Sequence, residues 1–97
     1  MSFHVDVRPG KKLGVDIQWR RIEPAGYQIT AIETEGDPFI LQWNKRSAET
    51  FPPDVIRFGD IIVRVNAAST RKEIWNVLKK PEEEWLIVIA RIEFAIQ

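Results

Sequence analysis

The segment from Lys11 to Trp19 constrains the fold more than any other part of this chain. It begins with two lysines and continues with residues that alternate in polarity. The apolar ones, which would share one face of an extended strand, are Val15, Ile17 and Trp19. The polar ones between them are Asp16 and Gln18. Gly14 stands where the strand begins, and glycine adopts backbone conformations there that other residues avoid. A turn of this kind can direct several N–H groups at one anion, such as a carboxylate.

The length and charge of the chain limit the classes of function. Its 97 residues fit one domain, residues 1–97, with one modest core. The 14 basic residues equal the 14 acidic ones, and a net charge of zero argues against broad binding to nucleic acid. The basic pairs are scattered along the chain, so we interpret them as solvated surface.

The composition also bears on the compartment. The absence of cysteine excludes disulfides, thiolate metal sites and a cysteine nucleophile, and fits a reducing environment. The first six residues lack the apolar run of a signal peptide. The longest apolar run, Leu86 to Ala90, is too short to cross a bilayer. We therefore expect a cytoplasmic protein without direct membrane insertion. These features leave the oligomeric state open, and a monomer is the default expectation.

Most of the chain reads as short strands separated by glycine and proline turns. Apolar and alternating segments predict strands at Phe3–Val7, Val15–Arg20, Tyr27–Ile32, Ile61–Val65 and Trp85–Phe94. The second and third should form an antiparallel hairpin through the turn at 23–26. In the fourth, the residues expected on the core face are Ile61, Val63 and Val65. The last should be the longest, and its apolar residues on both faces predict a central, largely buried position.

Two segments are candidates for helices. Thr70 and Glu73 have the spacing of a capping box, which predicts a helix from 71 to 80. One stripe of this helix holds Arg71, Trp75 and Leu78, and the adjoining core-facing stripe holds Ile74 and Val77. Asp37 could cap a second, short helix over 39–43 with Pro38 at its first position, although these residues could equally be extended. Residues 44–54 are predicted to form a loop.

The sequence offers no constellation typical of an enzyme. His4 is the only histidine, and it lies in a terminal strand where a structural role is expected. No paired carboxylates, nucleophile with a base, or set of metal ligands stands out. We therefore expect no catalytic residue, no metal and no cofactor, and a protein that is not an enzyme.

These elements, in this order, resemble a PDZ domain over nearly the whole chain. Three motifs carry the resemblance. Residues 12–15, Lys-Leu-Gly-Val, are similar to the carboxylate-binding loop of the family. Residues 56–66 are similar to its Gly-Asp turn and the strand that follows. Residues 71–79 are similar to the helix that borders its peptide groove. The resemblance implies an α+β fold, in which five or six strands form a partly open antiparallel barrel or sandwich. One long and one short helix would cap this barrel.

The resemblance also implies a function and a set of site residues. A PDZ domain is a protein–protein interaction module of scaffold and signalling proteins, and it binds the C-terminal tail of a partner by strand addition. The carboxylate-binding loop would be Lys12, Leu13, Gly14 and Val15, with backbone N–H groups of the last three holding the carboxylate. The groove and its pocket would be lined by Asp16, Ile17, Gln18, Arg71, Trp75 and Leu78. Leu13 and Val15 would also line the pocket for an apolar last residue.

Arg71 occupies the helical position that, in the family, reads the third residue from the end of the ligand. Its planar guanidinium suggests an acidic residue there. A solvated first-turn arginine is the alternative interpretation.

The sequence departs from the family pattern at several positions. Lys12 replaces the first glycine of the loop, and Val15 replaces a bulky aromatic residue. The insertion over 37–54 is longer than usual and resembles that of protist PDZ-like domains.

Trp75 stands where the family usually has a smaller residue, so it could favour a small terminal residue of the ligand or close the pocket. The alternative function is then a PDZ-like scaffold with an occluded groove that acts by packing or self-association. Its surface would comprise Phe39, Ile40, Leu41 and Trp43.

Overall fold

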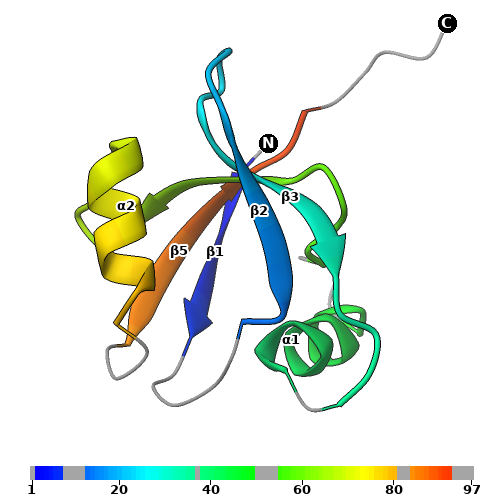
Figure 1. The fold of residues 1–97 in the computed structure, drawn as a ribbon. Helices are drawn as coiled ribbons and strands as arrows, with labels where there is room; N and C mark the ends of the chain where they lie inside the picture. Colours follow the sequence, from blue (N-terminus) through cyan, green and yellow to red (C-terminus); the bar gives the residue numbers. More distant parts are fainter. Residues whose placement is uncertain (1, 8–12, 37, 50–54, 81–83, 93–97) are drawn as a thin grey trace, which may run out of the picture.

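Five strands and two helices make up the described part of the chain (Figure 1). The computed structural model describes residues 2–7, 13–36, 38–49, 55–80 and 84–92. The elements in order are β1 (Ser2–Val7), β2 (Val15–Arg20), β3 (Gly26–Ile32), α1 (Phe39–Ser47), β4 (Ile61–Val65), α2 (Arg71–Leu78) and β5 (Trp85–Ala90). The fold is therefore a small α+β domain. Neither helix has the length or the apolar character needed to cross a bilayer within these described residues.

The five strands form one open antiparallel sheet in the order β1-β5-β4-β3-β2. The predicted hairpin of β2 and β3 is confirmed, and Trp19 faces Tyr27 across it. The central position predicted for β5 is also confirmed, because this strand lies between β1 and β4. The two edges of the sheet are β1 and β2, far apart in the strand order.

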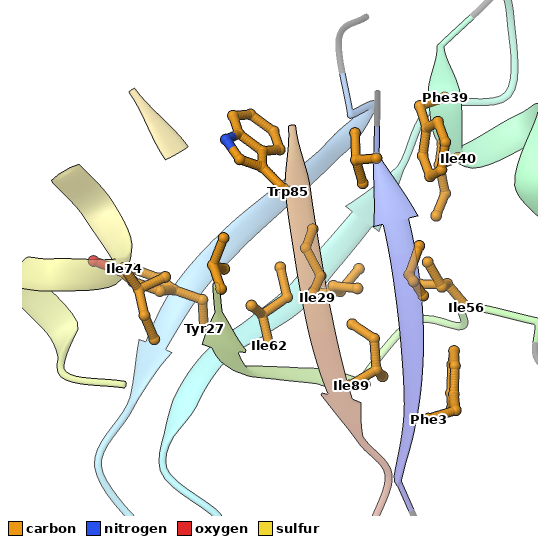
Figure 2. Close-up of a cluster of buried hydrophobic side chains, with 14 of the residues drawn as sticks. Phe3, Tyr27, Ile29, Phe39, Ile40, Ile56, Ile62, Ile74, Trp85 and Ile89 are labelled. Carbon is orange, nitrogen blue, oxygen red and sulfur yellow. The ribbon is translucent and has the colours of Figure 1, made fainter. Parts of the chain in front are cut away.

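One hydrophobic cluster joins the sheet to both helices (Figure 2). Buried Phe3, Val5 and Val7 of β1 belong to the same cluster against which half-buried residues of β2 pack. Since β1 and β2 are opposite edges, the sheet must curl around a shared core. Ile74 enters the cluster from α2, and Phe39 and Ile40 enter it from α1. The core-facing stripe predicted for α2 is therefore confirmed, with Ile74 fully buried and Val77 half-buried.

The prediction that Val63 faces the core is wrong. The pairing of β4 with β5 shifts between Ile62 and Arg64, so Ile62 faces Ile89 and Val65 faces Ile87. A bulge of this kind adds one residue to a strand and reverses the alternation beyond it. Ile62 and Val65 are consequently buried, and Val63 is only half-buried.

The last strand is shorter than predicted. It ends at Ala90 and has six residues, one fewer than β3. Arg91 leaves the ladder and donates hydrogen bonds to the Asp60 carboxylate and to the Val55 carbonyl. Leu86 is 44% exposed, so one face of β5 is less buried than its composition suggested. Phe94, the predicted end, lies outside the described residues.

The helix α1 is longer than predicted. It has nine residues and continues to Ser47, whereas α2 has eight and ends at Leu78, so α1 is not the short helix. Residues 44–47 therefore belong to a helix and not to the predicted loop. Pro38 precedes the helix as its N-cap and is not its first residue, and Asp37 lies outside the described residues. The Asn44 amide exchanges two hydrogen bonds with the backbone of Ile56, which fixes the next segment to α1.

Candidate functional site

An open cavity of about 530 Å³ lies between β2 and α2. The residues that line it are Ile17, Gln18, Trp19, Tyr27, Arg71, Lys72 and Trp75. Its volume falls within the range of ~300–1,000 Å³ that is typical of ligand sites. The edge strand and the groove helix, which lie far apart in the sequence, thus meet at one concave surface.

Three aromatic rings form the apolar part of this cavity. Tyr27 is buried and forms the floor, with the Trp19 ring at 5.1 Å in an edge-to-face arrangement and the Trp75 ring at 6.1 Å. The Tyr27 hydroxyl donates a hydrogen bond of 3.1 Å to the Arg71 carbonyl, which ties the floor to α2. Trp75 is 47% exposed and lines the cavity, so it does not fill the groove.

The helix α2 is anchored at its first turn. The predicted capping box is present: the Thr70 hydroxyl accepts a hydrogen bond from the Glu73 N–H and donates one of 2.9 Å to the Glu73 carboxylate. Hydrogen bonds from the Thr70 side chain, the Thr70 backbone and the Ser69 backbone hold the pKa of Glu73 below its usual value of 4.5. The Glu73 carboxylate, in the same first turn as Arg71 and Lys72, is thereby committed to the cap.

Two cations stand at the cavity, and neither has a carboxylate partner among the described residues. The Arg71 guanidinium lies 5.9 Å from the centre of the Trp19 ring, a cation–π arrangement. Lys72 follows it and is also exposed. Neither side chain forms an ion pair with any residue that the structure describes. This end of the groove is therefore both aromatic and positively charged.

The turn at Gly14 is braced by α1. Gly14 has a φ of +89°, and the Leu13 carbonyl accepts a hydrogen bond from the Ile40 N–H. The Gly14 carbonyl accepts one from Glu33. Among the hydrogen bonds of the described residues, none uses the N–H of Leu13 or Gly14 as a donor. Within the described residues, these two N–H groups are therefore not used by the domain itself.

The structure brings together four of the predicted site residues and separates others from them. The four are Ile17, Gln18, Arg71 and Trp75, all of which line the cavity. Leu13, Val15 and Leu78 are half-buried against the core and do not line it. Gly14 is buried in its turn, and Asp16 is exposed on β2. Lys12 lies outside the described residues.

Three lining residues were not predicted to belong to the site: Trp19, Tyr27 and Lys72. Trp19 continues the apolar alternation of β2 beyond Ile17, so its direction was evident from the sequence. Tyr27 is the cross-strand partner of Trp19, and the hairpin register would have indicated it. Lys72 adjoins Arg71 in the first turn of α2 and gave no separate signal.

The outer edge of β2 completes the geometry. In the sheet β2 pairs with β3 alone, so its other edge has no strand partner among the described strands. An edge strand presents a row of backbone donors and acceptors to an incoming segment.

No model of a known protein family matches this chain, and a search of curated proteins found no match. The described residues contain no cluster of three or more His, Cys, Asp or Glu that could hold a metal ion.

Proposed function

We propose that this chain is a PDZ-like interaction module that binds the C-terminal segment of a partner protein. The segment adds to the outer edge of β2 as an antiparallel strand, so backbone hydrogen bonds supply affinity and side-chain pockets supply selectivity. One observation carries the proposal. The edge strand β2 begins at a left-handed glycine turn and faces a helix across an open cavity.

The Gly14 turn would hold the terminal carboxylate. The N–H groups of Leu13 and Gly14 donate to no described residue, and the Val15 N–H follows at the first residue of β2. Hydrogen bonds to a charged group contribute roughly 1.5–3 kcal/mol each, so this turn would dominate the binding energy. The last, apolar side chain of the ligand would rest on the half-buried side chains of Leu13, Val15 and Leu78.

Arg71 would select an acidic residue third from the end of the ligand. It stands at the first helical position, beside the cavity, and pairs with no described carboxylate. A guanidinium matches a carboxylate through two parallel N–H···O bonds. Asp16 and Gln18 would border the intermediate positions of the ligand from the exposed side of β2.

Amidation of a binding peptide tests the capture of the carboxylate. We expect the free-acid peptide to bind more tightly than the amidated one by more than ~2 kcal/mol, about thirtyfold, because the amide loses the charge-assisted bonds. Isothermal titration calorimetry on a peptide selected from a C-terminal library measures the difference. Equal affinities for the two peptides would refute this role of the turn.

Arg71→Glu tests the selection of an acidic residue. We expect the preference at the third position from the end to change from acidic to basic, because the charge at the cavity is reversed. The measurement is a peptide array read with the wild type and the variant. Lys45→Glu is the matched control, since Lys45 is an exposed cation of α1 and does not line the cavity. An unaltered array for Arg71→Glu would contradict the assignment.

The alternative, a scaffold with an occluded groove, receives little support from the described residues. Trp75 lines an open cavity, and Phe39 and Ile40 are buried in the core of this same domain. Leu41 and Trp43 are half-buried against that core. The apolar surface that this alternative requires of α1 is therefore largely used within the domain.

A further inference from the structure

The cavity between β2 and α2 combines features that a simple apolar or acidic ligand would not use together. Its walls are the rings of Trp19, Tyr27 and Trp75, and its charged groups are Arg71 and Lys72. A carboxylate on a short side chain would meet the cations and leave the rings without a partner. A side chain without charge would meet the rings and leave the cations without one. The full lining therefore matches a ligand group that is both aromatic and anionic.

We propose that this cavity binds an aromatic side chain that carries a phosphate, namely a phosphotyrosine of the bound peptide. The inference rests on the proposed function, because it takes the groove to receive a peptide. Phosphotyrosine has a charge of about −1.5 to −2 near neutral pH and three strong acceptor oxygens. Its charge matches the combined charge of Arg71 and Lys72, whereas a single carboxylate matches only one of them.

The position of Arg71 suits this ligand. The Arg71 guanidinium carbon lies over the Trp19 ring, 5.9 Å from its centre. The N–H donors lie around the rim of a guanidinium, and none of those of Arg71 bonds a described residue, so they can reach phosphate oxygens. The backbone of Arg71 is fixed as well, because its carbonyl accepts the Tyr27 hydroxyl. The guanidinium is thus held before any ligand arrives, which lowers the entropic cost of binding.

Recognition of a methylated ammonium group is the main competing use of three aromatic rings. Two observations weigh against it. Arg71 and Lys72 would repel a second cation at the same cavity. Tyr27 already contacts both tryptophan rings, with centroids 5.1 and 6.1 Å away, so the three rings form one continuous side of the open cavity and not a closed cage around a cation.

Phenyl phosphate tests the chemistry of the cavity without a peptide. We expect it to shift the indole N–H resonances of Trp19 and Trp75 saturably, with a Kd at least about tenfold lower than that of inorganic phosphate or phenol. Arg71→Gln should raise this Kd at least about tenfold, whereas Lys45→Gln should leave it unchanged. Equal Kd values for phenyl phosphate and inorganic phosphate would overturn the proposal, and so would saturable binding of a trimethyllysine side-chain analogue in place of phenyl phosphate.

Four C-terminal peptides then test the assignment in the groove. They differ only at the third residue from the end, which is phosphotyrosine, tyrosine, glutamate or alanine, and each is also made as the amide. Phosphotyrosine should bind at least about tenfold more tightly than tyrosine and more tightly than glutamate. If the phosphotyrosine peptide does not exceed both, the inference fails even where amidation weakens all four. If phenyl phosphate binds as expected but amidation has no effect, the proposed carboxylate capture fails and the assignment of the cavity stands.

Discussion

Gly14 satisfies two requirements at one position. Its φ of +89° lies in the left-handed region, which side chains other than glycine rarely adopt. A Cβ added to it would also lie 2.5 Å from the Pro38 Cβ and 2.8 Å from the Ile40 Cγ2, distances too short for carbon atoms. Only glycine therefore allows the start of β2 to approach α1 this closely.

Gly14→Ala should lower the free energy of unfolding by about 2–4 kcal/mol, from backbone strain and the forced displacement of α1. Urea denaturation followed by tryptophan fluorescence measures the loss. Gly59→Ala is the matched control, because Gly59 has a φ of +88° but no atom within 4 Å of an added Cβ. Gly59→Ala should lower the free energy of unfolding only through backbone strain, by about 1–2 kcal/mol. Equal losses for the two variants would show that α1 does not press on this turn.

At the scale of single residues, the sequence was informative where the cause is local. The position of Gly14 before an alternating strand indicated a special turn, and the turn is left-handed. The contact of Gly14 with Pro38 and Ile40 was not predictable, because no local pattern reports which distant segment packs on a turn. The same holds for the bulge in β4, which only its pairing with β5 determines.

At the scale of elements, the two helices show what capping can and cannot predict. The start of α2 was predictable because Thr70 and Glu73 form a box within one turn. The N-cap of α1 is Pro38, which provides no side-chain hydrogen bond to the helix, so no local capping signal marks its start. Asn44, which favours loops by propensity, is accommodated because its amide bonds the backbone of Ile56. The loop predicted over 44–54 was wrong at residues 44–47 for this reason.

Thr70→Ala should destabilise the domain by about 1 kcal/mol, because the first turn of α2 loses its cap. Ser69→Ala, at the exposed neighbouring residue, should change stability by less than about 0.5 kcal/mol. Chemical denaturation of both variants and the wild type gives the comparison. A loss for Thr70→Ala no larger than that for Ser69→Ala would contradict the importance of the capping box.

The same capping box predicts a dependence on pH. The pKa of Glu73 is lower in the folded protein than its usual value of 4.5, because hydrogen bonds from Thr70 favour the ionised carboxylate. Its contribution to stability is therefore present above the unfolded pKa and is lost as pH falls through the folded one. Glu73→Gln should be less stable than the wild type at pH 7, and this difference should shrink as the pH is lowered from 7 towards 3. A difference that is constant across this range would contradict the role of the charge.

At the scale of the whole molecule, one ion pair joins segments that are distant in the sequence. Asp60, 2% exposed, accepts two hydrogen bonds of 2.9 Å from Arg91 and one of 2.8 Å from the Arg57 N–H. Arg91 also bonds the Val55 carbonyl and lies over the Phe3 ring. This ion pair therefore connects three segments: the turn before β4, the residue after β5 and the first strand.

Asp60→Asn should lower the free energy of unfolding by about 3–5 kcal/mol, because it leaves the Arg91 charge in a largely buried site without its counter-charge. Asp6→Asn provides the control, since Asp6 is exposed on β1, and it should change stability by less than about 0.5 kcal/mol. Thermal and urea unfolding measure both variants. If Asp60→Asn were as mild as its control, the pair would not be structural.

The candidate site was predictable only in part, because it depends on where β2 and α2 meet. The resemblance to a PDZ domain placed Ile17, Gln18, Arg71 and Trp75 opposite one another, and they line one cavity. Side-chain periodicity alone would have indicated which face of β2 and which face of α2 carry these residues. It would not have indicated that the two faces lie opposite each other. The position of the cavity among the aromatic residues at the start of α2 follows from packing, which the order of residues does not reveal.

An open edge such as that of β2 also has a consequence for solubility. The backbone groups that could receive a partner's tail could equally pair with β2 of a second molecule, and proteins limit this with short or charged edge strands. The strand β2 has six residues and carries the exposed charge of Asp16. Its ladder with β3 is also irregular between Asp16 and Ile17. These features leave the edge competent for a short peptide and unfavourable for a long, flat pairing, so they work against aggregation through β2.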